Sequence, residues 1–298
     1  MRSMFSPRNL TTLALAGLAG GVGFAAQATD VRVDVTNNGP AGGVFITPLW
    51  VGFHDGSFDS YSGGLSTQEG LERLAEDGTT SFISDDFLAG NTYVDGGVSG
   101  VFATAQTAGR VDGTIASPMG PPPIAPGETV SQAFNVDLAG DNQFFSYASM
   151  VLPSNDYFIA NGNPLAHDLS ALDGAPVGTS ITFFIGLGVN DAGTEVNDFA
   201  TSAANGLFPQ LGLGAGQGGP NIGTDENGVV TNVDGIPFAG FLNSPSDLDT
   251  NPDAALIDFN RADLYANGIA TVTITTIPEP GSLALLGLGG LALLRRRR

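Results

Sequence analysis

Two observations, the composition and the alternation of apolar and polar residues, predict an all-β protein, folded as an antiparallel β-sandwich. Gly, Ser, Thr, Asn and Asp are abundant and Lys is absent, a composition that suits strands joined by turns better than a bundle of helices. Several segments alternate apolar and polar residues with the period of two expected of a half-buried strand. Cysteine is absent, which excludes a disulfide framework and any thiolate ligand or nucleophile.

The strands are expected where apolar residues recur. Residues 31–36 and 269–277 alternate regularly, so each should turn one face to the core and one to water. Residues 145–152 and 180–187 are more continuously apolar and should be central strands. A further apolar run covers residues 45–53 and predicts another strand.

One short helix and one long loop are expected to interrupt the strands. Ser66-Thr-Gln-Glu69 has the pattern of a capping box, and apolar residues at helical spacing follow over 70–76 before Gly78. Residues 207–249 are rich in Gly, Pro and Asn and only weakly periodic, which predicts a long Gly-rich loop excursion. A β-hairpin around residues 228–233 is an alternative for part of it.

Residues 1–28 have the features of a cleavable secretory signal peptide. Two arginines precede an apolar run over residues 10–24, and Ala26 and Ala28 occupy the small-residue positions that signal peptidase recognises. We therefore expect this segment to be removed on export and to add nothing to the core.

Residues 278–298 have the features of a sorting tail. Pro278, Glu279 and Pro280 are followed by an apolar span shorter than the roughly 20 residues of a membrane helix, and then by four arginines. This order resembles the PEP-CTERM tail of Gram-negative bacteria. The resemblance implies cleavage near the motif by an exosortase, so that the chain meets the membrane only transiently through its tail. A permanent anchor is the alternative.

The remaining residues, 29–277, are expected to form one strongly acidic domain. The chain has a net charge of −20 at pH 7, and six of its ten basic residues lie in the two terminal segments, so this body is more acidic than the whole chain. Such a field repels nucleic acid and attracts divalent cations. No nucleic-acid partner is expected.

Little in the body predicts catalysis. The two histidines, His54 and His167, are each followed by Asp, but neither belongs to a nucleophile motif, and a structural role is favoured over a dyad or metal site. The Gly-rich residues 212–220 lack the Lys and Ser/Thr of a phosphate-binding loop. Paired carboxylates for glycoside hydrolysis stay open, since the body holds many acids and no pair stands out.

Acidic residues follow two of the predicted strands. Asp156 comes shortly after the strand at 145–152, and Asp191 and Glu195 flank a glycine after the strand at 180–187. Oxygen ligands on loops at one end of a β-sandwich commonly hold calcium. The spacing is not that of an EF-hand, and a solvated turn is the alternative.

The same loops carry a resemblance to the spondin domain of F-spondin-like matrix proteins. The matching segments, in order, are Thr47-Pro48-Leu49 with His54-Asp55-Gly56, and residues 70–78, 146–156 and 191–197. The resemblance extends over most of residues 30–275. It implies a C2-like β-sandwich with calcium as cofactor, bound by Asp156, Asp191 and Glu195. Glu195 stands where the animal proteins have Asp, and the lack of cysteine is a further difference.

These observations favour a non-enzymatic, exported protein of the cell surface or extracellular matrix. The expected activity is that of a calcium-binding adhesion or interaction module whose partner is an exopolysaccharide or another envelope or matrix component. Exosortase and signal peptidase would be partners during processing only. The alternatives are a secreted hydrolase acting on an extracellular polymer and a purely structural envelope protein.

Overall fold

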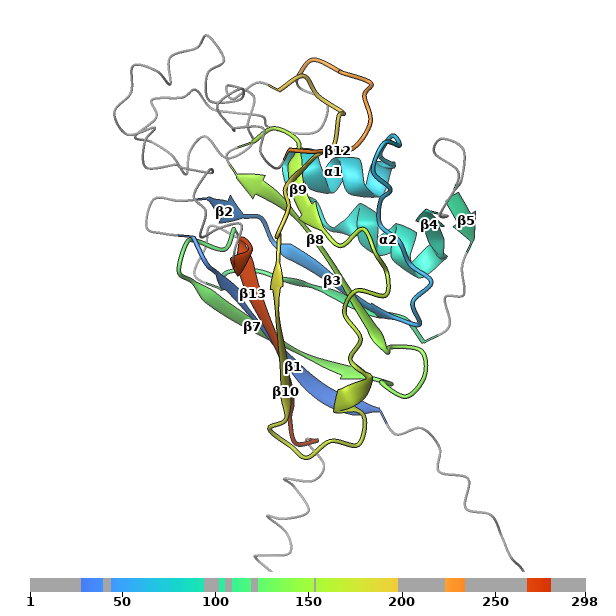
Figure 1. Ribbon diagram of the computed structural model, residues 1–298, viewed down its shortest axis with the longest axis vertical. Coiled ribbons are helices and arrows are strands. Elements are labelled where there is room, and N and C mark those ends of the chain that lie inside the picture. The colour runs from blue at the N-terminus through green and yellow to red at the C-terminus, as the bar shows by residue number, and fades with distance from the viewer. Residues whose placement is uncertain are drawn as a thin grey trace, which may run out of the picture.

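The fold is an antiparallel β-sandwich with two short helices on one outer face (Figure 1). The computed structural model describes residues 28–39, 44–93, 102–104, 109–118, 123–152, 154–197, 223–233 and 267–279. Every strand pairing among these residues is antiparallel. The predicted fold class is therefore confirmed.

The smaller sheet has four strands in the order β10-β13-β1-β7. Their bounds are Ser180–Ile185 for β10, Ala270–Thr276 for β13, Thr29–Asn37 for β1 and Thr129–Val136 for β7. The first and last strands of the body thus lie side by side, with Val31 opposite Thr276 and Asn37 opposite Ala270. The strands predicted at 31–36, 180–187 and 269–277 are confirmed.

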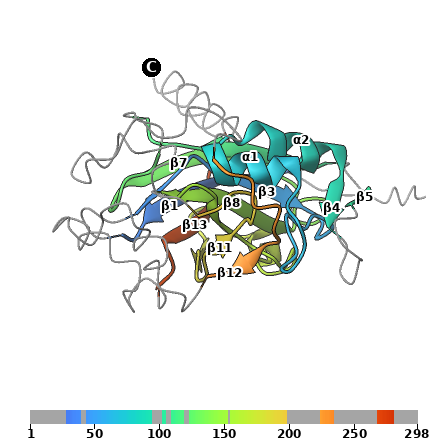
Figure 2. The same cartoon turned by 90° about the horizontal axis from the view of Figure 1, so that it is seen from above.

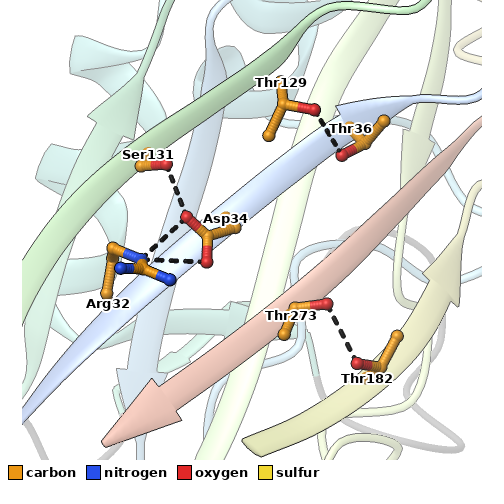
Figure 3. A network of polar contacts seen from close by, with 7 residues as sticks. All are labelled: Arg32, Asp34, Thr36, Thr129, Ser131, Thr182 and Thr273. Carbon is orange, nitrogen blue, oxygen red and sulfur yellow. Dashed lines mark hydrogen bonds and ion pairs between the residues drawn. The ribbon is translucent and has the colours of Figure 1, made fainter. Parts of the chain in front are cut away.

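The outer face of this sheet is a layer of short polar side chains that pair across the strands (Figure 3). The hydroxyls of Thr36 and Thr129 lie 2.8 Å apart, and those of Thr182 and Thr273 lie 2.9 Å apart. Asp34 accepts a hydrogen bond from Ser131 and also pairs with Arg32. Cross-strand pairs of this kind explain why β1 and β13 alternate between inward apolar and outward polar residues.

The larger sheet has seven strands. Six follow the order β12-β11-β9-β8-β3-β6, and β2 pairs with β8 beside them. Their bounds are Phe45–Ile46 for β2, Leu49–His54 for β3, Val111–Ile115 for β6, Phe144–Leu152 for β8, Tyr157–Ala160 for β9, Asn190–Asp191 for β11 and Thr231–Asn232 for β12. A separate two-stranded ribbon joins β4 (Asn91–Tyr93) to β5 (Phe102–Thr104).

One prediction about this sheet needs correction. The apolar run at 45–53 is two strands instead of one, because Thr47 and Pro48 separate β2 from β3, and proline cannot donate to a ladder. In the segment 228–233, where a hairpin was the alternative, the described residues form β12, which pairs with β11 from a distant part of the sequence. The rest of the predicted excursion, residues 207–222 and 234–249, lies outside the described residues.

The main core lies between the two sheets, and a second apolar cluster lies between the larger sheet and the helices. In the second cluster Trp50 is fully buried, with the ring of Phe87 edge-on at 5.2 Å. Its indole Nε1 donates to Asp112 at 2.9 Å, so that the polar atom of this large side chain keeps a partner. Both faces of the larger sheet are thus covered.

The described residues contain two short α-helices, where the sequence predicted one. Helix α1 spans Glu69–Asp77 and α2 spans Ser81–Ala89; a 3₁₀ turn, η1, covers Ser170–Leu172. The helices α1 and α2 lie side by side on one outer side of the sandwich (Figure 2). Helix α2 was missed because only Ile83 and Phe87 of its residues are buried, too few for a clear helical period.

The predicted capping box is also wrong. A capping box would make Ser66 the N-cap and Glu69 the third residue of the helix. Instead, Gln68 is the N-cap and makes no side-chain cap hydrogen bond, and Glu69 is the first residue of α1. The predicted end is correct, since Gly78 closes the helix with a left-handed φ of 71°.

Both ends of the body lie at the same end of the sandwich. Figure 1 shows the start of β1 and the end of β13 at the bottom of the molecule, and α1 and β12 at the top. The last strand is tied down to its end, since Ile277 N donates to Asp30 O at 2.9 Å. Within the described part of the chain, no helix is long and apolar enough to cross a membrane.

Candidate functional site

Strand pairing brings Asp156 and Asp191 together at the edge of the larger sheet. Asp156 lies directly before β9, and Asp191 in β11 is opposite Tyr157, the first residue of β9. Ala192 N also donates to Asp156 O at 3.1 Å. Residues far apart in the sequence thus become neighbours through a two-residue strand.

Asp156 is fully buried and only half satisfied. Its Oδ2 accepts hydrogen bonds from the backbone N–H groups of Thr194 and Glu195, both at 3.2 Å, whereas its Oδ1 has no partner. Burial, followed by the nearby carboxylate of Asp191, raises the pKa of Asp156 well above its usual range. The charged form is therefore unfavourable here unless a cation balances it.

The carboxylate of Asp191 is held by its own loop. Gly193 N donates to Oδ1 at 2.7 Å, and Asn197 Nδ2 donates to Oδ2 at 2.8 Å. Gly193 adopts a φ of +68°, and an added Cβ would lie 2.7 Å from the backbone of Val229. Glycine is therefore needed for the turn that places Asp191.

Glu195 is fully buried in the same loop, but its carboxylate is engaged elsewhere. Gly223 N donates to its Oε1 at 3.1 Å, and Asn155 Nδ2 donates to its Oε2 at 3.3 Å. Backbone pairing of Glu195 with Asp225 lays the segment 223–228 over the loop. Glu195 thus ties this segment to the loop that follows Asp191.

We call Asn155, Asp156, Asp191, Glu195 and Asn197 the carboxylate cluster. Three of its buried oxygens have no hydrogen-bond partner: Oδ1 of Asp156, Oδ1 of Asn155 and Oδ1 of Asn197. Carboxylate and amide oxygens are the ligands that calcium prefers. The donor set therefore fits a calcium ion in type and in its unmet need for a positive charge.

The three carboxylates predicted as ligands are not grouped as a three-carboxylate metal site. Among the described residues, no three or more His, Cys, Asp or Glu side chains are grouped so that they could hold a metal ion. A calcium site in this cluster would thus combine Asp156 and Asp191 with amide and backbone oxygens. Neither Asn155 nor Asn197 was singled out from the sequence. Asn155 directly precedes Asp156, and Asn197 lies two residues after Glu195.

A polar cleft of about 510 Å³ lies beside the cluster. Gly193 and Thr194 of the loop after β11 form part of its wall, and Glu72 of α1 and Asp225 add two carboxylates. Burial, together with the neighbouring Glu76 and Glu69, raises the pKa of Glu72. The cleft gives solvent and cations a negatively charged approach to the loop.

A second buried polar group, the imidazole cluster, consists of His54, Ser146 and Asn161. His54 Nδ1 accepts a hydrogen bond from Gly56 N at 2.9 Å, so Nε2 carries the ring proton and donates to Ser146 Oγ at 2.8 Å. Asn161 Nδ2 donates to the same Oγ at 3.0 Å. Burial, and then the positive charge of Arg110, lowers the pKa of His54 to about 4. In this tautomer His54 cannot take a proton from Ser146, so the pair is not arranged as a nucleophile and its base.

Among the described residues, His167 likewise has no contacts typical of a metal site or a dyad. Its ring stacks on Phe183 with centroids 4.1 Å apart, and burial lowers its pKa to about 4. The adjacent carboxyl of Asp168 accepts from the backbone of Ser170 and from Gln143. The interpretation of both histidines as structural groups therefore agrees with their contacts.

The predicted processing sites flank the folded body closely. Ala28 precedes the first strand directly, and Pro278 and Glu279 follow Ile277, whose backbone N–H donates to Asp30 O. Ala26, Pro280 and the rest of both terminal segments lie outside the described residues, so the secretory signal remains a prediction from sequence.

Comparison with known proteins identifies a known motif at the C-terminal end of the chain. A search of curated proteins found no significant match. The family model of the PEP-CTERM protein-sorting motif matches residues 276–298, from the last residue of β13 to the final arginine. The chain therefore carries a PEP-CTERM sorting signal and is an exported, exosortase-processed protein of the cell surface.

Proposed function

We propose that this protein is a non-enzymatic, calcium-binding interaction module of the cell surface or extracellular matrix, built on a spondin-like, C2-like sandwich. The observation that carries the proposal is the buried Oδ1 of Asp156, which has no partner and lies beside a second carboxylate. Leaving such a charge unpaired in the interior is costly, and a bound cation removes the cost.

Calcium would be held by Asp156 and Asp191, completed by the free oxygens of Asn155 and Asn197, by backbone carbonyls and by water. Glu195, the third predicted ligand, would bind the ion at the edge of the site or would hold Asn155 and Gly223 in place through its hydrogen bonds. The ion would supply positive charge and join the loop before β9 to the loop after β11. It would thereby order the end of the sandwich opposite the two processing sites.

The proposed partner is an exopolysaccharide or another envelope or matrix component. The sorting signal supports this proposal, because it directs the protein to the cell surface. The strong negative charge disfavours nucleic acid and anionic lipid as partners.

The proposal is tested by asking whether calcium controls association with the cell surface. Mature protein is added to cells that lack their own copy of it. The cells are then washed with calcium, magnesium or a chelator, and the fraction of protein that stays on the cells is measured. We expect retention with calcium and release by the chelator, and loss of both effects in Asp191→Asn. Asp173→Asn, which removes an exposed carboxylate from a different loop, is the matched control. Equal retention in all three washes would contradict the proposal.

A further inference from the structure

A second pocket, whose described lining residues include no acidic or basic side chain except one histidine, is the basis of a further inference. It has a volume of about 260 Å³, and its walls include Tyr61, Asn161, Asn163, His167, Phe184 and Asn190. We call it the amide pocket. We infer that the amide pocket binds one ring of a neutral saccharide. This inference rests on the proposed surface role and adds to it the class of polymer and the place where it binds.

The first argument is the absence of charge. None of the described residues that line the amide pocket is Asp, Glu, Arg or Lys, although the chain as a whole has a net charge of −20. His167, its one titratable base, is neutral above pH 4 because burial lowers its pKa to about 4. An anionic sugar or a phosphate would find no cation here, and an ammonium group would find no carboxylate. The pocket therefore suits a neutral ligand.

The second argument is the supply of amide groups. Asn161, Asn163, Asn190 and Asn232 all line the pocket. An amide has both a donor and an acceptor, which matches the hydroxyls of a sugar, since these also donate and accept. The amide of Asn161 is fully used within the wall, so the groups that could meet a ligand belong to the other residues. Asn163 is exposed and uses its Oδ1 to accept from Leu165 N at 3.0 Å, whereas no hydrogen bond of its Nδ2 is found with a described residue. This NH₂ group is thus available to a ligand.

The third argument is the apolar surface beside these amides. Phe184 is 43 % exposed and Leu187 is 52 % exposed, so an aromatic ring and a branched aliphatic side chain face water at the rim. A pyranose ring carries hydroxyls around its edge and C–H groups on its faces. An exposed aromatic face next to amide groups complements both, and desolvating it on binding is favourable.

The walls are fixed before any ligand arrives. Asn161 Oδ1 accepts from Tyr147 N at 2.9 Å, and its Nδ2 donates to Ser146 and to the carbonyl of Asn163. Asn190 Nδ2 donates to Tyr61 Oη at 3.1 Å. Pre-formed walls reduce the entropy that binding must overcome. The volume lies just below the roughly 300–1,000 Å³ of pockets that enclose drug-sized ligands, so one sugar ring of a longer chain fits the size.

The test is a calorimetric titration of the mature protein with defined oligosaccharides. The neutral probes are the hexasaccharides of β-1,4-glucose, β-1,3-glucose and β-1,4-mannose, the charged probe is an alginate hexamer, and a neutral hexapeptide of Gly and Ser is included. We expect saturable binding of at least one neutral hexasaccharide at millimolar or lower concentration. The alginate hexamer and the peptide should bind at least tenfold more weakly.

Variants place the binding in the pocket. Phe184→Ala should weaken binding tenfold or more and Asn163→Ala several-fold, because one removes the aromatic face and the other the available NH₂ group. Val177→Ala, which removes an apolar side chain that is 63 % exposed and does not line the pocket, should leave binding unchanged. Thermal unfolding of each variant confirms that it is folded.

The inference is overturned by any of three results. These are no saturable binding of any neutral probe, preference for the alginate hexamer or the peptide, or equal binding by the parent and both pocket variants. Titration in the presence of a chelator separates this inference from the proposed function. Saccharide binding that persists without calcium supports the pocket even where calcium binding itself fails.

Discussion

The carboxylate cluster and the imidazole cluster are both buried in the larger sheet, and they differ in whether their hydrogen bonds are complete. In the imidazole cluster, His54, Ser146 and Asn161 have no buried polar side-chain atom without a partner, and the cluster is neutral. In the carboxylate cluster, three buried oxygens lack partners and the charges are all negative. The complete neutral cluster is accounted for by its role in the core, whereas the incomplete negative one is where we propose that a cation binds.

The largest expected effect is the loss of calcium-dependent stability in Asp191→Asn. At a free calcium concentration about 100 times the dissociation constant, binding to the folded state alone adds about 2.7 kcal/mol to the free energy of unfolding. We expect most of this increment to disappear in the variant, because a charged ligand becomes a neutral one. Urea unfolding with calcium and with chelator measures it.

Without calcium, Asp191→Asn should be as stable as the parent or slightly more stable. The substitution removes repulsion from Asp156, and the amide of Asn197 can rotate so that its unpartnered Oδ1 accepts from the new NH₂ group. A loss of stability in chelator equal to the loss in calcium would show that Asp191 acts only as a structural residue.

A similar loss, but independent of calcium, is expected for Ser146→Ala in the imidazole cluster. This substitution leaves the buried Nε2–H of His54 without an acceptor, which costs about 1–3 kcal/mol. Urea unfolding should show the same decrease with calcium and with chelator. If the decrease depended on calcium, the two clusters would be coupled and the comparison drawn here would be wrong.

The pH dependence of stability gives a further, smaller test of the imidazole cluster. The pKa of His54 is about 4 in the folded protein and about 6.5 in the unfolded chain, so the unfolded chain binds more protons between these values. Its contribution to stability is complete above pH 6.5 and is lost as the pH falls toward 4, with a slope of up to about 1.4 kcal/mol per pH unit.

His54→Gln isolates this contribution. The raised pKa of Asp156 acts with the opposite sign, and His167 acts with the same sign, but both are present in parent and variant alike. We therefore expect the difference in unfolding free energy between parent and variant to shrink from pH 7 to pH 5. A difference that stays constant over this range would mean that His54 is not held neutral by burial.

The smallest effect on stability is expected for changes to the sorting motif. Pro278 and Glu279 lie beyond β13 and neither side chain is buried in the core, so Glu279→Ala together with Pro278→Ala should change thermal unfolding of the body only slightly. The same double variant should keep its tail and stay with the membrane fraction. Intact mass shows the outcome: a parent of residues 29 to about 280 and a variant that retains the apolar span. A parent that keeps the span would identify the tail as a permanent anchor.

Much of the fold could be predicted from the sequence because it depends on local patterns. Alternation in β1 and β13 reflects one buried and one solvated face, and this is visible in any short window. Helix α2 and the pairing of β12 with β11 could not be predicted, since α2 buries only two side chains and β12 has two residues. Both are stabilised by contacts with distant segments.

The proximity of Asp156 and Asp191 could be predicted from the sequence, but the direction of the Glu195 carboxylate could not. Asp156 and Asp191 were expected to meet because each follows a strand, and the β9–β11 pairing places them together. The direction of the Glu195 carboxylate depends on Gly223 and Asn155, and no local pattern reveals those contacts. The unpartnered amide oxygens of Asn155 and Asn197 likewise appear only once the loops are folded.

The most direct test of the account is a calorimetric titration of the mature protein with calcium. We predict a saturable heat that fits one ion per chain, with no comparable binding of magnesium at the same concentration. The binding should be lost in Asp156→Asn and in Asp191→Asn and kept in Asp173→Asn. The absence of saturable heat in the parent, or equal affinities in the parent and the two cluster variants, would contradict the claim that the incomplete carboxylate cluster is built for a cation.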